Sequence, residues 1–346
     1  MDSMAAQQCA CTCSPPVPRA AQEFMYASPA ITFADRWDHF LARWGVNRMG
    51  HVVQPGLYKL GLAIPESPVF ASANYTLSFD ALRSALAGID AYILVLDTRG
   101  INIWCAAGKG TFGTDELVRR IDATGLSGIV SHRRIILPQL GAPGVSAHEV
   151  SRRSGFSVEY GPVRARDLPA YLATHTATRE MRTVRFTLAD RLVLAPVELV
   201  HILLPMIAAA VVLYFLAGPV AALAAVSAVF AGTILFPALL PVIPTRDFST
   251  KGFILGAIVA IPFAATYALT PGLSGIGLII TVLVPLLIMP AVTAYLALNF
   301  TGSTTFTSRT GVKKEIFRYV PVMVIMAGAG TLLGIALGVL HLMGVA

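Results

Sequence analysis

The sequence predicts a soluble α/β domain followed by an all-α membrane domain of five helices. Of the 346 residues, 55% are hydrophobic, and the mean hydropathy of +0.68 exceeds that of ordinary soluble proteins. Charged residues are spread through the first half of the chain and become rare from about Val197 onward. We therefore expect the second half to lie in lipid and the first half in water.

Three regions follow from this change in composition. Residues 1–32, which contain cysteines and several prolines, are expected to form a flexible tail, residues 33–185 the soluble domain and residues 186–346 the membrane domain. Between about Pro68 and Leu172, short apolar runs alternate with amphipathic stretches, a pattern typical of a mostly parallel sheet with crossover helices. The expected strands are Val69–Ala71, Tyr92–Leu96, Arg134–Leu137 and Phe156–Tyr160.

Helices are expected between these strands. Apolar residues recur at helical spacing from Phe79 to Ile89. Thr114 is expected to cap a helix with acidic residues in its first turn, and Ser146 with Glu149 fits a capping box.

Five apolar stretches have about the length that a membrane-spanning helix needs, roughly 20 residues. They are residues 197–216, 219–243, 252–269, 275–298 and 320–342. Lys and Arg lie in the second and fourth connecting loops, which favours a cytoplasmic N-terminal domain and an outward C-terminus. The first residues lack the features of a secretory signal. The chain is thus predicted to be a multi-pass protein of the cytoplasmic membrane.

The net charge of +7 does not indicate nucleic-acid binding. Arg179, Arg182, Arg185 and Arg191 cluster just before the first apolar stretch, where a basic flank of a membrane helix is expected. We therefore expect a lipid partner and no nucleic acid.

One segment carries recognisable chemistry. After the strand that ends at Leu96, residues 102–109 read Asn-Ile-Trp-Cys-Ala-Ala-Gly-Lys. A cysteine thiolate is a soft metal ligand, and a cysteine at a helix start with Lys109 one turn further on is suited to that role. The small residues Ala106, Ala107 and Gly108 would let a flat macrocycle approach the backbone. Taken alone, however, a single cysteine after a strand is more often buried and inert.

The eight residues resemble the cap-helix signature of the membrane-anchored corrinoid proteins of microbial mercury methylation. They match the family form Asn-(Val/Ile)-Trp-Cys-Ala-Ala-Gly-Lys at every position. Residues 73–80, 137–145 and 299–308 are similar to segments of this family and of the corrinoid subunit of acetyl-CoA synthesis. Membrane spans after the soluble domain fit the mercury family better than the soluble subunit.

The resemblance implies a Rossmann-like, corrinoid-binding domain with cobalamin as cofactor and Cys105 as cobalt ligand. No Asp-x-His-x-x-Gly string, which would supply a histidine ligand, occurs in the sequence. The residues expected around the corrinoid are Asn102, Ile103, Trp104, Ala106, Ala107, Gly108 and Lys109 of the cap, with Asn74, Thr76, Gly141, Ala142, Pro143 and Gly144.

The activity implied is corrinoid-dependent methyl transfer to inorganic Hg(II), giving methylmercury. A thiolate opposite the methyl group favours its departure as a carbanion equivalent, which an Hg(II) acceptor requires. The oxidised cobalt must then be reduced at low potential, which implies a ferredoxin-like iron–sulfur partner. The methyl group would come from a methyltransferase or a methyl-folate.

Alternatives from other functional classes remain. The chain could be a methyl carrier of one-carbon metabolism with a non-mercury acceptor, or a membrane transporter with a corrinoid-sensing domain. Gly108, Gly110 and Gly113 spell a G-x-G-x-x-G, but they follow the strand at too great a distance for a dinucleotide site. Cys9, Cys11 and Cys13 could capture Hg(II) or be uninvolved thiols of the tail.

Overall fold

The computed structural model describes residues 24–271, 275–304 and 306–343. Its contacts divide the chain into two compact units. One comprises the chain up to Ile31 together with Val52–Met181, and the other comprises Thr32–His51 together with Arg182 onward. The structure therefore assigns residues 32–51 to the unit that holds the apolar helices, whereas the sequence placed most of them in the soluble domain.

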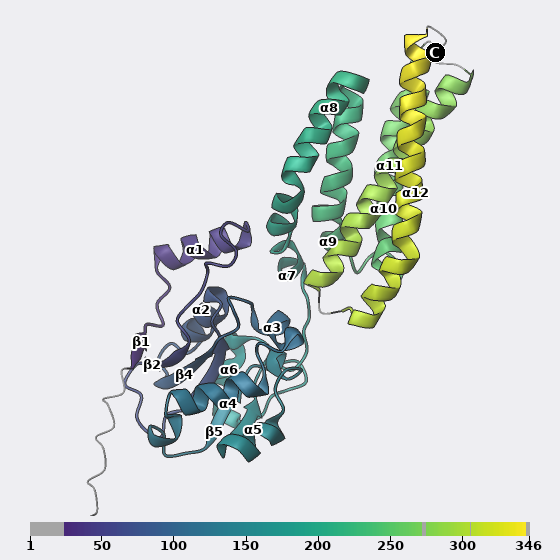
Figure 1. Cartoon of the computed structure of the whole chain (residues 1–346). Coiled ribbons are helices and arrows are strands. Elements are labelled where there is room, and N and C mark those ends of the chain that lie inside the picture. The colour runs from purple at the N-terminus through teal and green to yellow at the C-terminus, as the bar shows by residue number, and fades with distance from the viewer. Residues whose placement is uncertain (1–23, 272–274, 305, 344–346) are drawn as a thin grey trace, which may run out of the picture. The chain divides into compact units, whose positions relative to one another are not determined.

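The first unit is built on a six-stranded mixed sheet (Figure 1). Its strands are β1 (Met25–Ala27), β2 (Gly56–Leu60), β3 (Val69–Ala73), β4 (Ala91–Leu96), β5 (Arg134–Leu137) and β6 (Ser157–Tyr160). Their order is β1-β2-β4-β3-β5-β6, and every neighbouring pair is parallel except β2 with β4. The α/β prediction is confirmed, and the four expected strands are found as β3 to β6. The sequence reading missed β1 and β2, and β1 lies within the segment expected to be a tail.

Helices α2 to α5 connect the strands from β3 to β6, and α6 follows the last strand. They are α2 (Thr76–Ala85), α3 (Ile103–Lys109), α4 (Thr114–Ala123), α5 (Ala147–Ser154) and α6 (Leu168–Thr174). Ser146 caps α5, because its hydroxyl accepts a hydrogen bond from the backbone N–H of Glu149 at 3.4 Å. The prediction that Thr114 caps α4 is wrong, since Gly113 holds the N-cap position. The Thr114 hydroxyl instead accepts from the backbone N–H of Ser146 at 2.9 Å, which joins the starts of α4 and α5.

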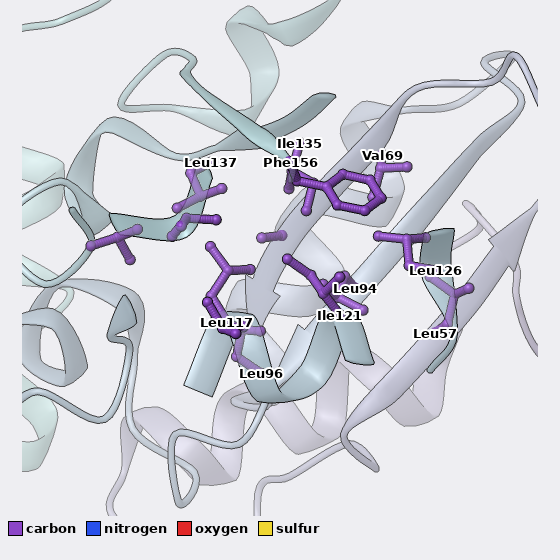
Figure 2. Packing of buried hydrophobic residues seen from close by; sticks show 14 of the residues in the cluster. Leu57, Val69, Leu94, Leu96, Leu117, Ile121, Leu126, Ile135, Leu137 and Phe156 are labelled. Carbon is purple, nitrogen blue, oxygen red and sulfur yellow. The ribbon is translucent and has the colours of Figure 1, made fainter. Parts of the chain in front are cut away.

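The core of this unit lies on both faces of the sheet. All six residues of β4 are buried, and alternate side chains enter opposite clusters, as expected for a strand covered on both faces. On one face Leu94 and Leu96 share a cluster with Leu117 and Ile121 of α4 (Figure 2). On the other face Ile93 and Val95 share a cluster with residues of α2 and α6.

The second unit is helical. Its helices are α1 (Phe33–Arg43), α7 (Leu188–Leu192), α8 (Ala195–Phe230), α9 (Phe236–Leu239), α10 (Phe248–Ala268), α11 (Gly275–Asn299) and α12 (Arg309–Leu342). Four helical stretches are long and apolar enough to cross a membrane: Leu188–Leu239, Phe248–Ala268, Gly275–Ser303 and Thr310–Leu342. The sequence predicted five spans; the first of these (197–216) and most of the second (219–243) fall within Leu188–Leu239.

Gly218 interrupts that first stretch. Its backbone angles, φ 83° and ψ −180°, are not helical, and a positive φ of this size is readily adopted only by glycine. Met206 and Val229, on either side of Gly218, belong to one buried cluster. In a continuous helix two residues so far apart in sequence would be separated by roughly 35 Å. The chain therefore turns back at Gly218. That each half crosses the bilayer separately stays a prediction.

Candidate functional site

Three loops meet at the carboxyl ends of adjacent parallel strands. Asn74 and Thr76 follow β3, the segment 97–109 follows β4, and the loop 138–146 follows β5. Because β4, β3 and β5 are neighbours in that order and parallel, their loops emerge from the same edge of the sheet. This edge is the usual ligand-binding position in α/β proteins. The structure thus brings to one edge the segments that contain the described residues expected around the corrinoid.

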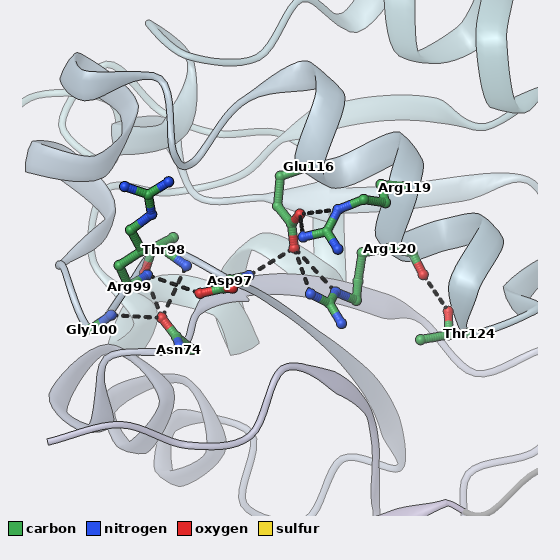
Figure 3. Close-up of polar contacts among 9 residues, drawn as sticks. All are labelled: Asn74, Asp97, Thr98, Arg99, Gly100, Glu116, Arg119, Arg120 and Thr124. Carbon is green, nitrogen blue, oxygen red and sulfur yellow. Dashed lines mark hydrogen bonds and ion pairs between the residues drawn. The ribbon is translucent and has the colours of Figure 1, made fainter. Parts of the chain in front are cut away.

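Asn74 holds the loop that leads to α3. Its buried Oδ1 accepts three hydrogen bonds, from the backbone N–H and the hydroxyl of Thr98 and from the backbone N–H of Gly100, at 3.0, 2.9 and 3.0 Å (Figure 3). Arg99, between the two donors, has a φ of 58°, so the loop makes a tight turn around this oxygen. The side-chain oxygen of Asn74 is therefore used to position the cap loop.

A buried carboxylate fixes the start of the same loop. Glu116 Oε1 accepts from the backbone N–H of Asp97 and from Nη2 of Arg120, both at 2.8 Å (Figure 3). Arg119 binds the other carboxylate oxygen. Glu116 is buried, so its negative charge is compensated by two guanidinium groups rather than by water. The residue was not identified from the sequence, where it reads only as an acidic residue in the first turn of α4.

Cys105 lies in the first turn of α3. Asn102 is the N-cap, and its Oδ1 accepts from the backbone N–H of Cys105 at 2.9 Å. Cys105 is a free, half-buried thiol, as expected for a side chain at the rim of a site rather than in the core. Trp104 is also half-buried, whereas Ala106 and Ala107 are buried and Gly108 and Lys109 are exposed. Cys105 therefore stays partly exposed on the cap helix, while Ala106 and Ala107 face the protein.

The loop after β5 packs directly on this helix. A Cβ atom at Gly144 would lie 2.2 Å from the carbonyl oxygen of Phe112 and 2.9 Å from Cα of Ala107, so only glycine fits. A Cβ at Gly141 would lie 2.5 Å from Cε1 of Phe112. Ala142 is half-buried and Pro143 is exposed. Gly144 therefore allows the loop to approach α3, and Gly141 allows it to approach the Phe112 ring just after that helix.

Tyr160 secures the far end of this loop. Its hydroxyl donates to the carbonyl oxygen of Val145 at 2.6 Å. Burial raises the pKa of Tyr160, because the phenolate would lose hydration there. The neutral phenol is therefore the form that holds the loop at physiological pH.

A cavity of about 240 Å³ opens at the same edge of the sheet. It lies between the ends of β3 and β5, the start of α2 and the first turn of α3, which contributes Ile103. Its lining is mostly apolar and includes two serines, Ser72 of β3 and Ser78 of α2. Ser72 is fully buried, and its hydroxyl oxygen has no hydrogen-bond partner among the described residues. Leaving a buried hydroxyl without a partner costs free energy.

Cys9, Cys11 and Cys13 lie outside the described residues. Thr76, the first residue of α2, is half-buried at the same edge of the sheet as the cavity.

Comparison with known proteins relates the first unit to corrinoid proteins. Residues 47–172 match the family model of the CO dehydrogenase/acetyl-CoA synthase delta subunit. The chain is 30% identical over 122 residues to the acetyl-CoA decarbonylase/synthase complex subunit gamma of Methanopyrus kandleri, covering 35% of this chain and 26% of that protein. It is 25% identical over 162 residues to the corrinoid/iron-sulfur protein large subunit of Moorella thermoacetica, covering 44% and 36%.

The α/β unit is related to the large subunit of a corrinoid protein. The matched segment contains all three loops of the site. The chain spans only about a quarter to a third of the length of these relatives. The apolar helices beyond residue 182 lie outside the family match.

Proposed function

We propose that the chain is a membrane-anchored corrinoid methyltransferase that transfers a methyl group to inorganic Hg(II). The observation that carries the proposal is Cys105, which a capped helix presents at the carboxyl edge of the sheet. When bound, the corrinoid would supply a cobalt ion that carries the transferable methyl group. Relation to a corrinoid/iron-sulfur protein supports this choice of cofactor.

The site fits a corrinoid on three grounds. Cys105 offers a soft thiolate donor at the rim of the site. The cavity that Ile103 of the same helix helps to line is bordered by Ser72, whose buried hydroxyl has no hydrogen-bond partner among the described residues. Since a corrin ring is much larger than this cavity, the cavity would take only a substituent of the cofactor. The exposed Gly108 and Lys109 leave the outer side of the cap free of bulky apolar groups.

The chain's own residues have distinct tasks in this proposal. Cys105 would hold the cobalt, and Asn102 would hold Cys105 through the backbone of α3. Asn74 and Gly144 would fix the loops on either side of α3, so that the thiol keeps one position. A preorganised ligand avoids the free-energy cost of ordering it on binding.

Mercury as the acceptor is supported by the full eight-residue match at 102–109 and by the apolar helices of the second unit. The Cys105 thiolate would donate electron density to the bound cobalt and so favour transfer of the methyl group as a carbanion equivalent, which an Hg(II) acceptor needs. The cobalt would then have to be reduced before it could take up another methyl group. A ferredoxin-like iron–sulfur protein is the proposed reductant, and a methyltransferase or methyl-folate the proposed methyl source.

The first test is the visible spectrum of the full-length protein, purified in detergent and loaded with cobalamin. A wild-type spectrum with a ligand-dependent shift that disappears in Cys105→Ala and Cys105→His would support thiolate ligation. A variant in which Cys9, Cys11 and Cys13 are all serine is the matched control and should keep the wild-type spectrum. Identical spectra for wild type and Cys105→Ala would refute the ligand assignment.

A second test separates the acceptors. The family matches favour the alternative of a methyl carrier in one-carbon metabolism, because the relatives are subunits of acetyl-CoA decarbonylase/synthase complexes. The methylated protein should produce methylmercury from Hg(II), and this product should be absent with Cys105→Ala. Methyl transfer to a biological thiol or enzyme without methylmercury formation would favour the alternative.

A further inference from the structure

Helix α1 exposes a face of four aromatic side chains. Phe33, Trp37, Phe40 and Trp44 are exposed by 82, 53, 47 and 37%, respectively. Their spacing of four, three and four residues places them on one side of the helix. Trp37 stacks on Phe40 with ring centroids 5.3 Å apart, and Phe40 is 5.7 Å from Trp44. We call these four residues the aromatic face.

The opposite side of α1 is occupied by its own chain. Ala42 is buried, and Asp38 Oδ1 lies 2.7 Å from Nδ1 of His51. The other ring nitrogen of His51 lies 2.7 Å from the carbonyl oxygen of Val46. These contacts fold the segment after the helix against the side that carries Asp38 and Ala42, about 140–180° around the helix from Phe33. The aromatic face is therefore directed away from the side of α1 that packs against its own chain.

The end of α1 lies near the start of the first apolar stretch. Both belong to the same compact unit. A Cβ atom at Gly45 would lie 3.3 Å from Cγ2 of Val197, in the first turn of α8. In the apolar window of Leu188–Leu239 only 6% of residues are buried within the structure, which leaves the surface of that stretch available to lipid. The end of α1 therefore lies beside the first turn of α8, where the surface available to lipid starts.

The composition of α1 fits the boundary between lipid headgroups and acyl chains. Tryptophan is enriched at this boundary, because its ring is largely apolar and its N–H remains close to water. Arg36 and Arg43 flank the aromatic face on one side and are exposed. Amphipathic helices with basic flanks and aromatic apolar faces lie in the plane of the membrane surface.

We propose that α1 is an interfacial helix whose aromatic face is embedded in the bilayer beside the first residues of α8. The occupant of this face is the membrane in which the chain's own apolar helices sit. The inference rests on the membrane anchoring in the proposed function and is independent of the cofactor and of the methyl acceptor.

The test measures fluorescence of single-tryptophan variants of the full-length protein in nanodiscs. The variant W44F/W104F retains Trp37, on the aromatic face. Its emission should be quenched at least twofold more by lipids brominated near the headgroup than by lipids without bromine, and aqueous iodide should quench it weakly. The matched control, W37F/H39W/W44F/W104F, moves the indole two residues along, about 200° around the helix. Emission from the indole at position 39 should be quenched strongly by aqueous iodide and only weakly by brominated lipid.

Incorporation into nanodiscs tests the anchoring separately. If the protein enters nanodiscs and Trp37 is quenched by iodide but not by brominated lipid, the helix faces water or a protein and the inference is overturned. Equal lipid quenching of Trp37 and of the indole at position 39 would also overturn it, because no face would then be distinguished. Neither result would bear on the proposed methyl transfer. That proposal is tested separately by the visible spectra of the wild type and Cys105→Ala loaded with cobalamin.

Discussion

Replacing Asn74 by alanine should release the loop that carries the cap helix. The change removes one acceptor oxygen that takes three hydrogen bonds and leaves the backbone N–H groups of Thr98 and Gly100 without a partner in a buried site. At about 1.5 kcal/mol for each of the two buried N–H groups left without a partner, the closed loop should lose about 3 kcal/mol. That corresponds to roughly a hundredfold increase in the population of the open loop.

Hydrogen exchange of the full-length protein, followed by mass spectrometry, measures this opening directly. The peptide that contains residues 97–102 should exchange roughly a hundredfold faster in Asn74→Ala, because local opening governs exchange of protected amides. Asn74→Asp keeps an acceptor oxygen at the same place, so its exchange should rise much less. The peptide that covers α6 serves as an internal reference. Unchanged exchange at 97–102 in Asn74→Ala would refute the assigned role of Asn74.

Three other outcomes follow from the site. Gly144→Ala should displace α3, because the added Cβ would lie 2.2 Å from the carbonyl oxygen of Phe112. Cobalamin binding, measured by fluorescence titration, should weaken at least tenfold. Unchanged affinity would contradict this packing. Ser72→Ala should leave the cofactor-free protein equally or more stable in thermal unfolding. It should weaken cobalamin binding roughly fivefold, which corresponds to about 1 kcal/mol. Unchanged affinity would show that this hydroxyl contacts no ligand. Burial raises the pKa of Tyr160 above its usual value of 10.0. The stability that it contributes should therefore be complete below pH 10 and decline as pH rises through the folded-state pKa, with a shallower decline in Tyr160→Phe.

Local patterns were sufficient for the central part of the sheet. Strands β3 to β6 are short apolar runs bounded by turn residues, and each was predicted close to its observed bounds. Strands β3 and β4 and most of β5 are buried, so burial selects their residues directly, whereas β6 lies at the sheet edge and is only partly buried. Strands β1 and β2 were missed because they are short and their pairing depends on distant partners. β2, for example, pairs with β4 more than thirty positions away.

The sequence located Cys105 and the segments around it, but not how they are held. The sequence places Asn74 among the residues expected around the corrinoid, and only the structure shows that its oxygen binds the loop at Thr98 and Gly100. Glu116 looks like an ordinary helix-start acid, whereas it is buried and holds Asp97. These roles require residues twenty or so positions apart to meet, and no local pattern encodes such a meeting.

By itself, the sequence determined the α/β class, the apolar helices and the peptide that carries Cys105, because these depend on residue type and short-range periodicity. Only the tertiary structure decided that Ser72 lies unpartnered in a cavity, that Gly144 packs on Ala107 and that α1 turns its aromatic side outward. The physical reason is that burial, hydrogen-bond satisfaction and exposure depend on what surrounds a side chain, and the chain must fold before those neighbours are in place.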